Sequence, residues 1–63
     1  MTFKEARTAA KISQGELAKR LNVQQSAVSH WDNELFAPTR KYRAQIARIF
    51  GVKESDIEWK ERE

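Results

Sequence analysis

The stretch from Ile12 to Asp32 constrains the fold of this chain more than any other part of its sequence. It contains two short amphipathic segments separated by a turn at Asn22-Val23. The apolar positions that recur at helical spacing are Leu17, Ala18 and Leu21 in the first segment, and Ala27, Val28 and Trp31 in the second. Asparagine is, after glycine, the residue best suited to the left-handed conformation that ends many helices. The pattern therefore predicts two short helices joined by a tight turn.

The outward face of the second segment is unusual, because short, uncharged, hydrogen-bonding side chains occupy it. Solvated helix faces normally carry Lys and Glu. Side chains that both donate and accept are the kind needed to recognise base edges in a DNA major groove. The candidate base-contacting residues are Gln25, Ser26, Ser29 and His30. The alternative is that they are ordinary polar residues on a solvated helix, an alternative that is strongest for Ser29 and His30.

The same stretch resembles the helix-turn-helix of the lambda-repressor-like (Cro/cI-type, XRE) family. The positions that fall on the family pattern without insertion are Ser13-Gln14, Leu17-Ala18, Leu21, Val23, Val28-Ser29 and Trp31. Pro38, Ile46-Ala47 and Gly51-Val52 extend the resemblance over about the first 57 residues. The chain departs from the family at Asp32, where Glu is usual, and at Asn22 and Glu34, where Gly is common.

The resemblance implies that double-stranded DNA is the partner and that the second helix of the motif enters the major groove. It implies phosphate contacts from Gln14 and from residues that flank the loop after that helix, namely Asn33, Thr39, Arg40 and Lys41. It also implies a structural ion pair between Arg7 and Asp32, whose geometry is altered because Asp is one methylene shorter than Glu. The alternative for Gln14 is a solvent-exposed residue at the helix start, and for Arg40 and Lys41 it is a solvated charge pair.

Helix signals along the rest of the chain predict an all-α fold, a compact bundle of about five short helices. Thr2 with Glu5, and Ser13 with Glu16, have the spacing of capping boxes, whereas Gln24 is a poor N-cap. The sequence predicts helices over about 2–10 and 13–22, a third from 25 to 32 or 33, a fourth from 39 or 40 to 50, and a short fifth near 54–57. Helices two and three are expected to form the helix-turn-helix. We expect one domain over 1–63, with a tail at 57–63 that frays.

Composition narrows the classes of function. The 63 residues include no Cys and one His, which excludes a disulfide framework and a structural zinc site, and we expect no metal, cofactor or small-molecule ligand. No apolar run has the length of a membrane span and no signal peptide opens the chain, so we expect a cytoplasmic protein. Residues 1–50 carry nine Lys and Arg against four Asp and Glu, which suits a polyanionic partner. No nucleophile motif or phosphate loop is present, so an enzyme is not expected.

The leading hypothesis is a sequence-specific transcriptional regulator, namely a small Cro-like repressor of a phage or mobile element. It would bind a pseudo-palindromic DNA site as a homodimer, and this dimer would form only on DNA if dimerisation is weak. The alternative is a protein-binding module, such as an antitoxin or controller domain, with Leu35, Phe36 and Trp59 as its apolar clue. For Trp59 two roles stay open, a dimer interface and a cap on the core.

Overall fold

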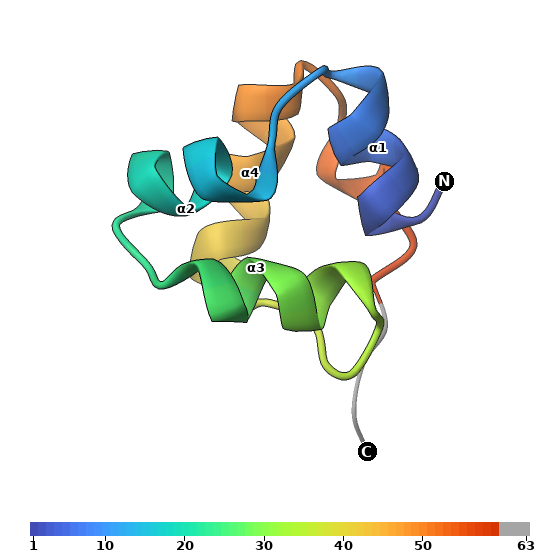
Figure 1. The fold of residues 1–63 in the computed structure, drawn as a ribbon. Helices are drawn as coiled ribbons and strands as arrows, with labels where there is room; N and C mark the ends of the chain where they lie inside the picture. The colour runs from blue at the N-terminus through green and yellow to red at the C-terminus, as the bar shows by residue number, and fades with distance from the viewer. Residues whose placement is uncertain (60–63) are drawn as a thin grey trace.

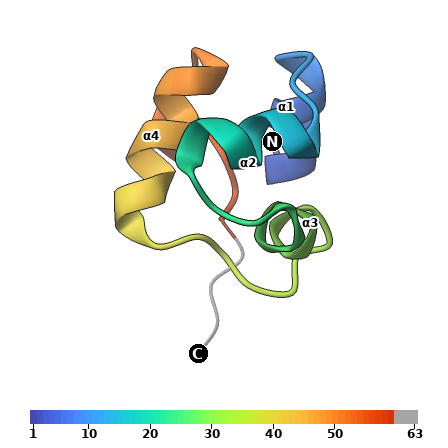
Figure 2. The ribbon, with the colours of Figure 1, turned by 60° about the vertical axis from the view of Figure 1, so that its left-hand side comes forward.

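The computed structural model describes residues 1–59 and contains four α-helices and one turn of 3-10 helix in that range. The elements are α1 (Phe3–Ala9), α2 (Gln14–Leu21), α3 (Gln25–Asp32), α4 (Arg40–Phe50) and η1 (Glu54–Asp56). Figure 1 shows α3 along one edge of the molecule, with the other helices gathered on its inner side. Figure 2 shows α3 almost end-on, and the helix again lies at the periphery of the molecule. Its outer face is therefore not covered by another helix of residues 1–59. The expected all-α bundle is confirmed.

The first two helices begin where the sequence predicts. Thr2 accepts a hydrogen bond from the Glu5 backbone N–H at 3.1 Å, and the Glu5 carboxylate accepts from the Thr2 N–H at 2.8 Å. At α2 only half of the expected box forms, because the Ser13 hydroxyl caps Glu16 while the Glu16 carboxylate pairs with Arg20 at 2.7 Å instead. The starts of α3 and α4 have no side-chain cap hydrogen bond.

All four α-helices end in the same backbone motif. In each, a residue with positive φ follows the last turn, and two backbone N–H groups reach back across that turn in the Schellman pattern. The four residues are Lys11 (φ 60°), Asn22 (φ 58°), Glu34 (φ 59°) and Gly51 (φ 74°). Only Gly51 is the residue type that adopts this conformation without steric cost. The left-handed Asn22 was expected, whereas no residue type at the other two positions signalled it.

The hydrophobic core lies between the inner faces of the helices. Leu17, Val28 and Ile46, one each from α2, α3 and α4, are completely buried. Phe3 of α1 joins them to an aromatic cluster, since its ring centroid lies 5.8 Å from those of Trp31 and of Phe50. The core therefore fixes the inner face of α3 and leaves its outer face to the solvent.

The segment after α4 differs from the expected fifth helix. Residues Glu54–Asp56 form a single 3-10 turn, and the following Ile57 is extended and buried. A parallel β-bridge then pairs Glu58 with Thr2, so this segment lies against the start of the chain. Burial of Ile57 and this backbone bridge hold the first residues of the tail, at 57–58, against the rest of the domain. The expected tail at 60–63 lies outside the described residues.

Candidate nucleic-acid interface

Helices α2 and α3 pack as a helix-turn-helix through their small and aliphatic side chains. Ala18 and Leu21 of α2 are buried, as is Val28 of α3, and the half-buried Val23 fills the turn between the helices. The left-handed Asn22 reverses the chain after α2, and the extended Gln24 then starts α3. The turn and the apolar contacts together set the position of α3 on α2.

The structure brings the four predicted base-contacting residues to one outward face of α3. Gln25, Ser26 and His30 are exposed, and Ser29 is half-buried beside them. The Gln25 side chain lies against the first turn of α2. Its Oε1 atom is 3.5 Å from the position that a Cβ atom on Gly15 would occupy. Within residues 1–59, none of the four side chains forms a hydrogen bond to another helix. The Ser26 hydroxyl donates to the neighbouring Gln24 Oε1 at 3.5 Å, and the other donors and acceptors of the four side chains are available to a ligand.

A buried carboxylate locks α3 onto the two preceding helices. Arg7 Nη2 lies 2.7 Å from Asp32 Oδ2, and Arg7 Nε lies 3.1 Å from Asp32 Oδ1, so the contact is a two-pronged ion pair. The Asp32 side chain is 2% exposed and that of Arg7 is 13% exposed. A pair this deep is costly to break, because the remaining charge would stay buried without a partner. Arg7 Nη1 also donates to the Ile12 carbonyl at 2.7 Å, which holds the α1–α2 connection.

Gln14 forms the third arm of this network. Its Nε2 donates to Asp32 Oδ2 at 2.8 Å, and the residue is half-buried at the start of α2. Sequence reasoning assigned Gln14 to a phosphate and missed this contact. No local pattern signals it, because the contact depends on where α2 and α3 meet, 18 residues apart in the chain. One Gln14 side-chain N–H and the backbone N–H groups of the first turn of α2 can still face a phosphate.

The other predicted phosphate-contacting residues flank the loop between α3 and α4. Thr39, Arg40 and Lys41 are exposed at the start of α4, and the Thr39 hydroxyl makes no capping bond. Asn33 is also exposed, and its Nδ2 donates to the Ser29 carbonyl at 3.0 Å. The first turn of α4 therefore combines two cations with backbone N–H groups that point outward, an arrangement suited to an anion.

Arg43 holds this loop in place and was not singled out from the sequence. Its Nε donates to the Pro38 carbonyl at 2.8 Å, and Pro38 itself is buried. The Arg43 guanidinium also lies over the Trp59 ring, 5.6 Å from its centroid. Arg43 therefore connects the end of the loop to α4 and to the last described residue.

Trp59 packs against the core. Its ring centroid lies 6.4 Å from that of Phe3, and its indole Nε1 donates to the Glu54 carbonyl at 3.0 Å. The residue is half-buried. These contacts match the core-capping role that the sequence left open.

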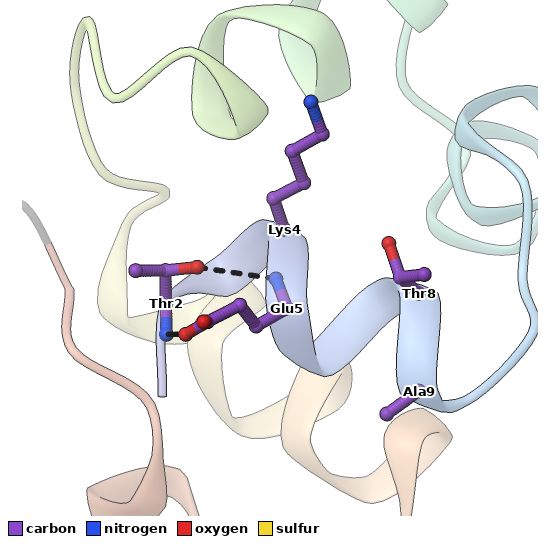
Figure 3. Close-up of a pocket in the computed structure, with 5 residues that line it drawn as sticks. All are labelled: Thr2, Lys4, Glu5, Thr8 and Ala9. Carbon is purple, nitrogen blue, oxygen red and sulfur yellow. Dashed lines mark hydrogen bonds between the residues drawn. The ribbon is translucent and has the colours of Figure 1, made fainter.

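A shallow, mostly apolar depression lies on the surface of α1 and its N-cap. It is lined by Thr2, Lys4, Glu5, Thr8 and Ala9, shown in Figure 3. The Glu5 carboxylate is already engaged there by Thr2. The hydrogen bond from the Thr2 backbone N–H, and to a lesser extent the one from the Thr2 hydroxyl, lowers the pKa of Glu5 below its ordinary value. One lysine beside an engaged carboxylate does not form a catalytic group of residues.

Two further properties of residues 1–59 concern membranes and metal ions. None of the helices in residues 1–59 has both the length and the apolar character needed to cross a bilayer. In the same part of the chain, His, Asp and Glu side chains nowhere gather in threes to form a metal site.

Comparison with known proteins gives one match. A family model described as helix-turn-helix matches residues 3–57, which includes α1 to α4 and the buried Ile57. A search of curated proteins and a search of solved structures returned no significant match.

Proposed function

Because this chain belongs to the helix-turn-helix family of DNA-binding transcription regulators, we propose that it is a small Cro-like repressor that binds a pseudo-palindromic operator as a homodimer. The observation that carries the proposal is the outward face of α3. Its four short polar side chains make no hydrogen bonds to other helices in residues 1–59, while the Asp32 network and the core hold the helix itself rigid. A rigid helix with free donors and acceptors is suited to base recognition.

In the proposed complex α3 lies in the major groove with its N-terminal residues deepest. The Gln25 carboxamide can accept from adenine N6 and donate to adenine N7, a pairing that distinguishes adenine from the other bases. Ser26 can donate or accept beside it, and the His30 imidazole can donate to guanine O6 or N7 one turn later along the helix. Ser29 lies between them and is the least exposed of the four.

Phosphate contacts would position the domain without carrying sequence information. The start of α2 with Gln14 would bind one phosphate, and the start of α4 with Thr39, Arg40 and Lys41 would bind another, while Asn33 borders the loop between them. Helix N-termini favour anions because of their unpaired N–H groups and dipole. The net charge of +3 supports binding to a polyanion.

The size of the domain agrees with a dimer assembled on the operator. Its longest extent is 28 Å, whereas half-sites one helical turn apart have centres about 34 Å apart. Two copies on neighbouring major grooves would therefore contact one another only at their edges. Such a small interface would make dimerisation weak in the absence of DNA. In this proposal the protein acts on bacterial or phage DNA inside the cell.

A protein-binding module remains the second candidate, favoured by one observation. Leu35 is 62% exposed and Phe36 is 37% exposed, next to each other in the loop after α3. In this alternative the domain would be an antitoxin or controller whose main partner is another protein, and DNA binding would be secondary.

The experiment that tests the proposed function is selection from a random DNA pool at near-physiological salt, followed by sequencing of the bound sites. An enriched inverted repeat with half-sites about one turn apart supports the dimeric operator-binding repressor. Fusing the enriched site to a promoter then shows whether the protein lowers transcription. No enrichment, with the protein shown to be folded, would reject the proposal and favour the protein-binding module.

A further inference from the structure

The loop after α3 places an aromatic ring against the recognition face of that helix. The ring centroid of Phe36 lies 5.5 Å from that of His30, with the two planes inclined by 57°. This separation and tilt are those of a favourable aromatic pair. Within residues 1–59 neither nitrogen of the His30 imidazole has a hydrogen-bond partner, and the contact with Phe36 is the ring contact that it makes.

The backbone brings Phe36 to this position. The left-handed Glu34 turns the chain back along α3, and the Leu35 N–H donates to the His30 carbonyl at 3.0 Å. The far end of the loop is held by the buried Pro38, whose carbonyl accepts from Arg43. Both ends of the loop are therefore tied to helices, and the ring of Phe36 is carried by a constrained segment.

Phe36 also lies at the border of the core, although 37% of the residue is exposed. Together with Ala37 and Pro38 it lines a cavity beside Trp31 and Trp59, with a volume of about 10 Å³. A space this small holds at most a single water molecule, so it leaves no room for the phenyl ring to move inward. Phe36 thus lies between the edge of the core and one side chain of the recognition face.

We propose that Phe36 positions the His30 imidazole, and so determines which base His30 recognises and how strongly. An exposed histidine on a helix populates several rotamers, and only one geometry can bond a given base edge. A neighbouring ring that favours one rotamer reduces the ordering required when DNA binds. Phe36 is a positioning residue in this scheme, because it acts on specificity through His30. The inference rests on the proposed function, since it requires that α3 binds operator DNA.

The first test uses the free protein and does not depend on DNA. In an NMR spectrum the ring current of Phe36 shifts the Hδ2 and Hε1 resonances of His30. We expect Phe36→Leu to abolish this shift and Phe36→Tyr, which keeps the ring, to retain it. Leu35→Ala is the matched control, because it alters the neighbouring exposed apolar side chain. His30 resonances that are the same in Phe36→Leu and the wild type would overturn the proposal.

The second test repeats the selection from a random pool with Phe36→Leu, Phe36→Tyr, His30→Ala and the double variant of His30→Ala with Phe36→Leu. We expect His30→Ala to identify one base pair at which discrimination is lost. Phe36→Leu should lower discrimination at that same base pair about 2- to 10-fold, the equilibrium effect of losing one aromatic contact. Phe36→Tyr should restore it, and the double variant should lose no more than His30→Ala alone.

The outcomes separate the two proposals. If the wild type enriches a site and Phe36→Leu leaves every base preference unchanged, or weakens binding to all sequences equally, the positioning role is rejected while the repressor remains. If the wild type enriches no site, the proposed function is rejected and this inference with it. Thermal unfolding of Phe36→Leu verifies that the variant folds.

Discussion

Glu34 occupies a backbone position that suits glycine, and replacing it should stabilise the domain. It has φ 59° at the end of α3, a conformation that costs a residue with a Cβ roughly 1–2 kcal/mol. Its carboxylate also lies at the negative end of the helix dipole, which costs about 0.3–1 kcal/mol. Within residues 1–59 the side chain makes no hydrogen bond or ion pair that would compensate. Both penalties disappear in Glu34→Gly.

The gain is reduced because glycine has more conformational freedom in the unfolded chain, at a cost of about 0.5–1 kcal/mol. The net stabilisation expected for Glu34→Gly is therefore about 1 kcal/mol. For a domain of this size that corresponds to a melting temperature higher by about 4–8 °C. Urea unfolding followed by the fluorescence of Trp31 and Trp59 measures the free energy directly, with an unchanged m-value as the sign of an unaltered fold.

Glu34→Ala is the matched control. Alanine removes the charge but keeps the Cβ, so it should gain only a few tenths of a kcal/mol. Asn22→Gly should also gain little, because asparagine already tolerates this conformation. If Glu34→Gly is no more stable than Glu34→Ala, the backbone argument is refuted, and electrostatics alone would account for any gain.

Other variants test the interface and the scaffold. Gln25→Ala should lose about 1–3 kcal/mol of discrimination at one or two base pairs in competition binding, whereas an equal loss for all sequences would exclude base contact. Joint replacement of Arg40 and Lys41 by Ala should weaken binding to every sequence and reduce the slope of log K against log salt by about 2, and an unchanged slope would remove them from the phosphate contacts. Asp32→Asn should lower the free energy of unfolding by about 3–5 kcal/mol, because Arg7 loses its buried counter-charge, and a loss below 1 kcal/mol in urea unfolding would contradict this. The stability that Glu5 contributes should be complete above its ordinary pKa of 4.5 and be lost as the pH falls through its lowered folded-state value, and Glu5→Gln should flatten this acid limb of the stability curve.

Much of the fold follows from local signals in the sequence. Thr2 and Ser13 start helices because a hydroxyl at that position caps the first turn, and Leu17, Val28 and Ile46 are buried because helical spacing puts them on inner faces. Each of these signals involves residues only a few positions apart in the chain, so it can be recognised in the sequence without knowledge of the fold.

The remaining features depend on contacts that no local pattern encodes. The Glu side chain at position 34 does not itself favour a left-handed residue, and only the glycine common there in the family hints at one. The backbone hydrogen bonds around Glu34 impose that conformation against its own preference. The bond from Gln14 to Asp32 depends on where α2 and α3 meet, 18 residues apart in the chain. The positions of Phe36 beside His30 and of Arg43 on Pro38 depend likewise on the path of a loop that the sequence marks only as irregular.

The sharing of Asp32 by α1 and α2 divides α3 into two sets of residues that can change independently. The inward set, Val28, Trp31 and Asp32, belongs to the scaffold, and exchanging any of these residues disturbs three helices at once. The outward set, at 25, 26, 29 and 30, can be replaced without that consequence. A new target sequence can therefore be acquired through a few side chains, by natural variation or by design. A substitution at Asp32 itself would instead break the bonds from both Arg7 and Gln14 and so affect α1 and α2 together.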